Sequence, residues 1–413
     1  KTLPIERLDF SLRKILKAKY WMGLHNYKPV VLENLQDDLN TVKDELLHRA
    51  LVKNSITLVK DKKQNIPLAN LDYQKIAYVK LGDDSGSHFL NTLKNYTKVA
   101  EVSDKNLDGL LKKLKPYNQV IVGFHKSNNH PWKSYKFTQK ELVWLQEIAR
   151  NCNVILDVFT SPYSLLQIKS FTNIETLLVS YQNSKLAQEL SAQAIFGAIK
   201  IKGKLPVSIR EEFKEGTGID TYSLSRLEYT TPEDAQMSSS QLAYIDTISK
   251  TILEEKMAPG FQVLVARKGK VVYQKSFGYH TDEKKKEVKN SDIYDLASLT
   301  KILASLPLIM KAEEEEKITL SSSLKEILPS FENTNKASVS VKEILSHYGR
   351  LKAWIPLYLK TKDSITKKNS PEYYRSKKIG RFSVKVAENL YIKKSYKDSI
   401  NKYIREVDQR EKE

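Results

Sequence analysis

Residues 120–124 read Val-Ile-Val-Gly-Phe, and residues 154–159 read Val-Ile-Leu-Asp-Val-Phe. Each run is short, largely apolar and bounded by polar segments, which is typical of a strand that is buried on both faces. Between them, Thr138 and Glu141 have the spacing of a capping box, and the apolar residues that follow have a helical spacing. This order of strand, helix and strand predicts a parallel sheet covered by helices.

The same alternation extends in both directions along the chain. We expect further strands at residues 55–60, 76–81 and 176–180, and further helices at residues 5–23, 42–51, 89–95 and 184–197. The unit closes near Gly203, so we assign residues 1–210 to a largely parallel α/β sandwich domain with a leading helix. Residues 211–236 contain Gly216, Gly218 and Pro232 without clear periodicity, and we interpret them as a linker.

A second domain is predicted over residues 237–413. Its first segment, residues 237–256, carries apolar residues on one side and is expected to be a helix. Residues 261–266 and 271–277 flank the turn Lys268-Gly269-Lys270, which predicts a β-hairpin.

A Ser-x-x-Lys pair, Ser298 and Lys301, stands at the head of the apolar stretch that follows the hairpin. Residues three apart on a helix share a face, so a neutral lysine amine at this spacing can take the serine proton and make the hydroxyl a nucleophile. The N-terminus of a helix also supplies free N–H groups for an oxyanion. Four other pairs have the same spacing: Ser11/Lys14, Ser322/Lys325, Ser364/Lys367 and Ser399/Lys402. Only Ser298 follows a helix and a hairpin, and this context distinguishes it.

This arrangement resembles the serine β-lactamase and penicillin-binding-protein family, in which a helix and a hairpin precede the helix that bears Ser-x-x-Lys. The segment 276–279 is similar to the end of the family's hairpin. Residues 344–347 are similar to a segment that the family continues as Thr-Ser-Gly-Leu, where this chain has Tyr348-Gly349-Arg350-Leu351. The resemblance implies an α+β domain with Ser298 as nucleophile and Lys301 as base.

The family also has a Tyr-x-Asn motif and a Lys/His-x-Gly strand. Tyr396-Lys397-Asp398 fits the first motif loosely, and no segment fits the second. We therefore expect the β-lactamase-like domain to be incomplete, truncated at its C-terminus, and this fragment to be inactive or nearly so.

The first domain has a resemblance of its own. Its segments 11–20, 48–60, 66–68 and 203–208 are similar to the part of glycoside hydrolase family 3 that follows the barrel, a C-terminal α/β domain. Fusion to a β-lactamase-like domain resembles the bacterial β-N-acetylglucosaminidases of this family. The resemblance implies a glycosidase whose catalytic aspartate and His-Asp pair lie in a barrel that this sequence lacks, a cell-wall-derived glycan or an acyl or peptide substrate, and a periplasmic or secreted location.

The first domain also offers candidate residues of its own. His125, His130 and Trp132 follow a predicted strand, at the sheet edge where open α/β sheets bind ligands. They form either a sugar-facing loop or, the interpretation we favour, a solvated loop whose histidines have hydrogen-bond partners. Asp83 and Asp84 lie in a Gly-Asp-Asp-Ser-Gly turn that needs such residues for its geometry, so we do not include them in the site.

Composition limits the remaining classes of function. The 413 residues carry 68 Lys and Arg against 49 Asp and Glu, a net charge of +19. Lysine dominates and no nucleic-acid motif is present, so we expect a solvated basic surface and no nucleic acid partner. The single cysteine, Cys152, belongs to no metal-ligand cluster, and we expect no metal, no cofactor and no membrane span. A non-catalytic binding or scaffold module with a basic surface for an anionic partner remains the alternative function, and the oligomeric state is left open.

Overall fold

The computed structural model describes residues 3–411. The chain divides between Asp292 and Ile293 into two compact units. This division lies inside the predicted second domain, because the hairpin belongs to the first unit. The domain boundaries 1–210, 211–236 and 237–413 therefore stay predictions.

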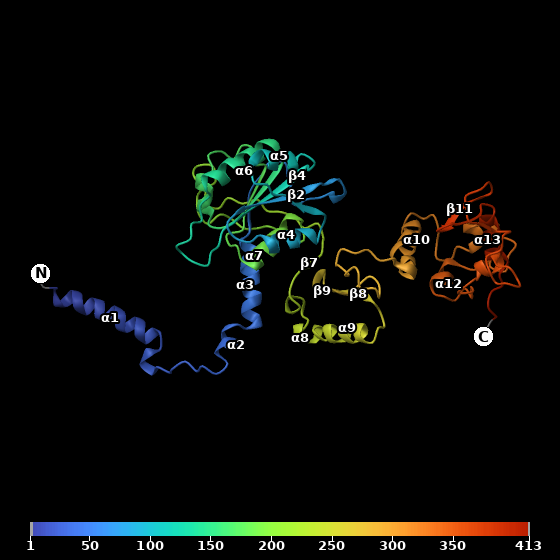
Figure 1. The fold of residues 1–413 in the computed structure, drawn as a ribbon. Helices are drawn as coiled ribbons and strands as arrows, with labels where there is room; N and C mark the ends of the chain where they lie inside the picture. Colours follow the sequence, from blue (N-terminus) through green and yellow to red (C-terminus); the bar gives the residue numbers. More distant parts are fainter. Residues whose placement is uncertain (1–2, 412–413) are drawn as a thin grey trace. The chain divides into compact units, whose positions relative to one another are not determined.

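The first unit contains a six-stranded sheet in the order β1-β6-β5-β4-β2-β3 (Figure 1). The strands are β1 (Thr57–Asp61), β2 (Ile76–Gly82), β3 (Val99–Glu101), β4 (Gln119–His125), β5 (Val154–Phe159) and β6 (Thr176–Val179). Strands β2 to β6 pair in parallel, and β1 runs antiparallel to β6 at one edge. The prediction of a largely parallel α/β fold is confirmed.

Helices cover both faces of this sheet, which explains why β4 and β5 are buried along their whole length and are largely apolar. One face packs against α3 (Val42–Ser55), α4 (Ser87–Lys94) and α7 (Lys185–Ile195), and the other against α5 (Leu107–Leu114) and α6 (Gln139–Asn151) (Figure 1). The predicted capping box of α6 is present, with Thr138 and Glu141 bonded to each other's backbone N–H groups. Helix α5 and strand β3 were not predicted.

The leading helix is α1 (Ile5–Trp21), and a short helix, α2 (Leu35–Leu39), follows it. Helix α1 ends, as the sequence predicts, before Gly23, whose φ of 76° is left-handed. None of its residues is buried, so the apolar stripe of Leu8, Leu12 and Ile15 is exposed.

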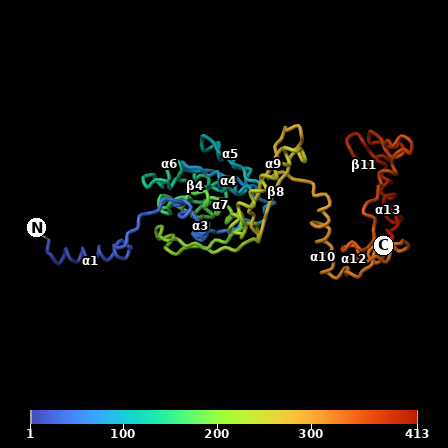
Figure 2. The backbone as a smooth tube through the Cα atoms, turned by 90° about the horizontal axis from the view of Figure 1, so that it is seen from below, coloured from blue at the N-terminus to red at the C-terminus, as the bar shows by residue number. Residues whose placement is uncertain are grey.

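The hairpin is formed by β8 (Gly260–Arg267) and β9 (Lys270–Gly278), after α8 (Ser239–Leu242) and α9 (Tyr244–Glu254) (Figure 1). Figure 2 marks α9 and β8 on the backbone tube. Its turn residues Lys268 and Gly269 have φ angles of 54° and 75°, the left-handed values that a two-residue hairpin turn requires. A two-residue strand, β7 (Glu228–Tyr229), pairs in parallel with β9. The predicted linker therefore contributes a strand to the hairpin sheet.

The second unit holds a smaller fold with few buried side chains. It contains α10 (Leu306–Glu314), α11 (Leu324–Ile327), α12 (Val341–Leu345), α13 (Tyr396–Glu406) and a three-stranded antiparallel sheet of β10 (Tyr374–Arg375), β11 (Phe382–Ala387) and β12 (Leu390–Lys393). Within residues 3–411, no helix is both long enough and apolar enough to cross a bilayer.

Candidate functional site

Ser298 lies in a short 3-10 turn, η5 (Ala297–Leu299), and Lys301 begins a π-helical segment, η6 (Lys301–Ser305). The regular α-helix begins only at Leu306, eight residues after the serine. Ser298 therefore stands at the head of a helical segment, as the sequence predicts, but the first turns of this segment are 3-10 and π-helical. The turn is held by Asp295, whose Oδ1 accepts a hydrogen bond from the N–H of Ala297 at 2.7 Å.

The two side chains nevertheless meet. The Nζ of Lys301 donates a hydrogen bond to the Oγ of Ser298 at 3.1 Å. The four other Ser-x-x-Lys pairs lie in the described part of the chain and form no such side-chain bond; Lys367 binds the carbonyl oxygen of Ser364 instead. The structure thus brings together the pair that the sequence context selects.

This geometry permits proton transfer between the pair. The Oγ and Nζ atoms are within the distance that a nucleophile and its base require. In the observed hydrogen bond the amine is the donor, so catalysis needs a lysine that has lost a proton and accepts one from the hydroxyl. Both side chains are exposed, which leaves the hydroxyl accessible to a substrate.

Tyr396, the loose match to a Tyr-x-Asn motif, is packed inside the second unit. It is buried at the start of α13, and its hydroxyl donates to the carbonyl oxygen of Leu357 at 2.7 Å. This bond occupies the only proton that the side chain can donate, so Tyr396 packs and anchors the helix.

His125 is fully buried at the end of β4, inside a hydrogen-bond network. Its Nε2 lies 2.9 Å from the Tyr78 hydroxyl and its Nδ1 lies 2.7 Å from Oδ1 of Asn183. Burial lowers the pKa of His125 to about 4, against the raising effect of the Asn183 bond, so the ring is neutral at pH 7. The favoured interpretation, a solvated loop whose histidines have hydrogen-bond partners, is right about the partners of His125 but wrong about its solvation, because the residue ends β4 and is buried. His130 and Trp132 are exposed in the loop that follows.

The same network holds Asp84, a residue that the sequence analysis left out of the site. The Nδ2 of Asn183 donates to Oδ2 of Asp84 at 3.0 Å, and the N–H of Ser85 donates to Oδ1 at 2.9 Å. Partial burial works against the charge, but these bonds outweigh it and hold the pKa of Asp84 below its usual value. Asn183 and Gln188, which complete the network, carry no pattern in the sequence that marks them.

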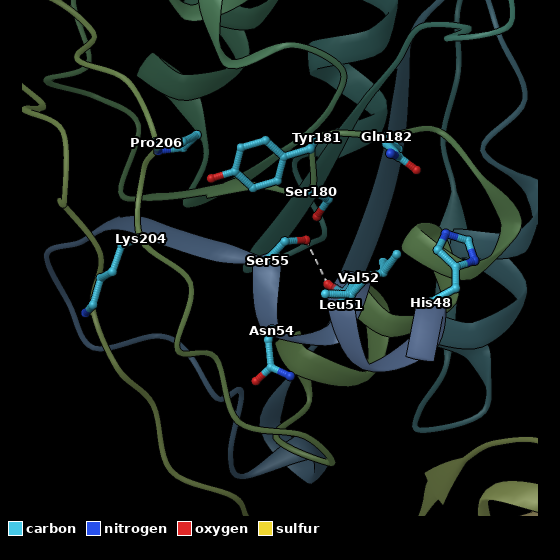
Figure 3. Close-up of a pocket in the computed structure, with 10 residues that line it drawn as sticks. All are labelled: His48, Leu51, Val52, Asn54, Ser55, Ser180, Tyr181, Gln182, Lys204 and Pro206. Carbon is cyan, nitrogen blue, oxygen red and sulfur yellow. Dashed lines mark hydrogen bonds between the residues drawn. The ribbon is translucent and has the colours of Figure 1, made fainter. Parts of the chain in front are cut away.

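A pocket of about 460 Å³ opens beside Tyr181, between the end of α3 and the segment around Lys204 (Figure 3). Its polar groups are largely paired within the protein. The Tyr181 hydroxyl lies 2.8 Å from Oγ1 of Thr57, and Ser180 donates to the buried Asp157 at 2.8 Å. Lys204 binds the carbonyl oxygen of Gly218 at 2.7 Å. Few groups remain to bind a ligand, so we do not assign a site to this pocket.

No group of three or more His, Cys, Asp or Glu side chains is placed to hold a metal ion anywhere in residues 3–411. The strongest chemical feature of the described chain is therefore the Ser298–Lys301 pair. Beside it lies a cleft in the second unit that the sequence analysis did not predict.

Comparison with known proteins identifies the class of the segment around this pair. Residues 246–379 match the family model described as "Beta-lactamase". The expected resemblance is confirmed for this part of the chain, which is similar to the β-lactamase family.

Two kinds of curated relative match part of the chain. "Protein flp" of Staphylococcus aureus (strain NCTC 8325 / PS 47) is 30% identical over 129 residues, which is 30% of this chain and 25% of that protein. A "Beta-lactamase" of Providencia stuartii is 27% identical over 123 residues, 29% of this chain and 31% of that protein. The match thus spans about a quarter to a third of the length of these relatives.

Solved structures similar to the chain include glycoside hydrolase family 3 enzymes. A β-N-acetylglucosaminidase of this family from Paenibacillus sp. str. FPU-7 has a TM-score of 0.36 and 16% identity, over 50% of this chain and 40% of that one. A fungal multi-domain β-N-acetylglucosaminidase has a TM-score of 0.36 and 18% identity, over 47% of this chain and 22% of that one. Similarity of this extent carries no argument about activity.

Proposed function

We propose that Ser298 and Lys301 are the nucleophile and the base of a serine acyl hydrolase. The observation that supports this most directly is the 3.1 Å hydrogen bond between their side chains, inside the segment that matches the β-lactamase family. A non-catalytic scaffold requires no such pair at an accessible position.

The reaction follows from this pair. Lys301 accepts the hydroxyl proton of Ser298 while Oγ attacks the carbonyl carbon of an ester or amide, and a tetrahedral intermediate forms. The intermediate collapses as the bond to the leaving group breaks, and the lysine returns the proton to that group. Water, activated by the same amine, then attacks the acyl-serine ester and releases the acid and the free hydroxyl.

The experiment uses the full-length protein that carries this sequence and a fluorescent fluorophosphonate or penicillin probe. Labelling is expected in the wild type and lost in Ser298→Ala. Ser364→Ala is the matched control, because Ser364 belongs to a Ser-x-x-Lys pair of the same unit whose side chains do not meet. Labelling that survives in Ser298→Ala, or no labelling at all, would exclude the nucleophile and favour the scaffold function with its basic surface.

For the first domain we propose a role in a β-N-acetylglucosaminidase-like glycosidase. The support is the sequence resemblance of residues 11–20, 48–60 and 203–208 to glycoside hydrolase family 3. Together the two halves suggest turnover of cell-wall glycans and their acyl or peptide groups in a bacterial envelope, in the periplasm or outside the cell. The test is release of 4-nitrophenol from its N-acetyl-β-glucosaminide by the full-length protein, and no release would contradict this role.

A further inference from the structure

A cleft of about 530 Å³ lies next to the Ser298–Lys301 pair, entirely within the second unit. One side is formed by η6 and the start of α10, and the other by the segment that follows α12. Lys301 lines the cleft, and its Nζ donates a hydrogen bond to the Ser298 hydroxyl at 3.1 Å; Ser298 itself is not a lining residue. Lys301 therefore connects the proposed nucleophile to the cleft.

The lining of the cleft combines two chemistries. Apolar side chains come from both sides: Ile302, Leu306, Ile309, Ile344, Leu345 and Leu351. The charged residues of the lining are all basic, namely Lys301, Arg350, Lys352 and Arg410, and no lining residue is Asp or Glu. Apolar walls with positive charge fit a ligand that has an aliphatic part and an anionic group.

The wall that carries Arg350 has an unusual backbone. His347 and Arg350 have φ angles of 63° and 51°, a left-handed conformation that residues other than glycine rarely adopt. The wall is held from outside, because the carbonyl oxygens of Gly349 and Arg350 accept hydrogen bonds from Gln409 Nε2 and the N–H of Arg410, both at 2.9 Å. Left-handed backbone conformations of residues other than glycine are energetically unfavourable, so they persist only where the surrounding structure fixes them. Such residues cluster at ligand sites.

We propose that this cleft binds the acyl group of the substrate, and that this group is an aliphatic chain with a negative charge. The inference rests on the proposed function, because the aliphatic chain of the substrate must be attached to the carbonyl carbon that Ser298 attacks. The apolar walls exclude water from the chain, and Arg350 with Lys352 binds the anionic group. The substrate class is therefore an ester or amide of an anionic aliphatic acid.

The test compares the rates at which three fluorophosphonate probes label Ser298 in the full-length protein. The probes carry an ethyl chain, an octyl chain, and an octyl-length chain that ends in a carboxylate. We expect the octyl probe to label at least about tenfold faster than the ethyl probe, since each buried methylene contributes to binding. The carboxylate probe is expected to label several-fold faster again.

Two variants connect these preferences to the cleft. Arg350→Gln should lower the ratio of the carboxylate rate to the octyl rate, and Leu345→Ala should lower the ratio of the octyl rate to the ethyl rate. Lys385→Gln, on an exposed position of β11 outside the cleft, is the control and should change neither ratio. Circular dichroism verifies that each variant is folded.

The outcomes separate the two proposals. Labelling that depends on Ser298 at equal rates for all three probes would overturn the acyl cleft and leave the nucleophile in place. Ratios that stay unchanged in both Arg350→Gln and Leu345→Ala would also overturn it. Absence of any labelling that depends on Ser298 would contradict the proposed function, and this inference with it.

Discussion

The ammonium group of Lys53 lies 2.9 Å from both carboxylate oxygens of Glu228. Lys53 belongs to α3 of the sandwich, and Glu228 belongs to β7, which pairs with the hairpin. Arg49, one turn before Lys53, donates to the carbonyl oxygen of Tyr229 at 2.6 Å and lies 3.6 Å from Glu228. The carboxylate therefore joins the sandwich to the hairpin sheet through two basic groups.

Glu228→Gln is expected to loosen this junction. The variant leaves Arg49, whose side chain is only 9% exposed, without its counter-charge. Breaking a buried ion pair lowers the free energy of unfolding by about 3 kcal/mol. Because Lys53 is partly exposed, we expect a smaller loss here, about 2 kcal/mol. Hydrogen exchange of the β9 amides should accelerate more than tenfold, while exchange of the β4 amides stays unchanged.

The matched control for this prediction is Glu175→Gln. Glu175 pairs with Lys63 at 3.4 Å, and that lysine is 59% exposed. The substitution should therefore lower the free energy of unfolding by no more than about 0.5 kcal/mol. Equal exchange of the β9 amides in Glu228→Gln and in the wild type would show that β7 does not hold the hairpin.

The segment around Glu228 also shows where reasoning from sequence stopped. Strands β2, β4, β5 and β6 could be predicted because burial on both faces demands long apolar runs. Residues 211–236 have no such run, since their order comes from hydrogen bonds of the backbone: Arg226 binds the carbonyl oxygens of Leu68 and Phe196, and Gln193 binds both backbone groups of Tyr229. Bonds of this kind leave no periodic pattern.

Because His125 is buried as a neutral ring, we expect the folded protein to lose stability in acid. The pKa of this residue is about 4 in the folded protein and 6.5 in an exposed chain, so between these values the unfolded state binds more protons. The stabilisation is complete above pH 6.5 and is lost as the pH falls towards 4. The pKa difference corresponds to about 3 kcal/mol.

His125→Gln removes this proton-linked contribution. Its free energy of unfolding, measured with urea between pH 7 and pH 4, should fall less steeply with acidification than that of the wild type. His88, an exposed histidine on α4, supplies the control His88→Gln, which should keep the wild-type slope. A slope in His125→Gln as steep as in the wild type would mean that His125 is not buried as a neutral ring.

Asp157 is expected to give the opposite dependence of folding stability on pH. It lies in β5 at the centre of the sheet, and burial raises its pKa to about 6, although hydrogen bonds from Ser191 and Ser180 lower it. The folded state therefore binds more protons than the unfolded state between pH 3.8 and pH 6. The stability that the protonated carboxyl contributes is complete below pH 3.8 and is lost as the pH rises through 6.

Asp157→Asn should abolish this loss, which corresponds to about 3 kcal/mol. Relative to the wild type, the variant should gain stability as the pH rises from 4 to about 6 in urea unfolding, and this gain should level off above pH 6. The exposed Asp72→Asn is the control and should show no such relative gain. A constant difference between Asp157→Asn and the wild type across this range would contradict a raised pKa.

Only part of the candidate site could be predicted from the sequence. The spacing of Ser298 and Lys301 and their place after the hairpin sufficed to select this pair among five. The cleft beside them did not follow from the sequence, because Arg350 and Arg410 are 60 positions apart and come together only when the last segment packs on residues 349–350. The irregular start of the helix was also missed, since it depends on the turn that Asp295 holds.

Lys301→Gln tests whether the amine acts as a base or only packs beside the serine. Glutamine retains the side chain's polarity and a hydrogen-bond donor for Ser298, but it cannot carry the proton. General-base catalysis contributes about a hundredfold to ten-thousandfold, so the rate of fluorophosphonate labelling in the full-length protein should fall by at least about a hundredfold. Lys367→Gln, in the pair whose side chains do not meet, should label at the wild-type rate. Labelling of Lys301→Gln within a few-fold of the wild type would show that the hydroxyl is not activated by this lysine, because a packing role would be retained by glutamine and a proton-transfer role would not.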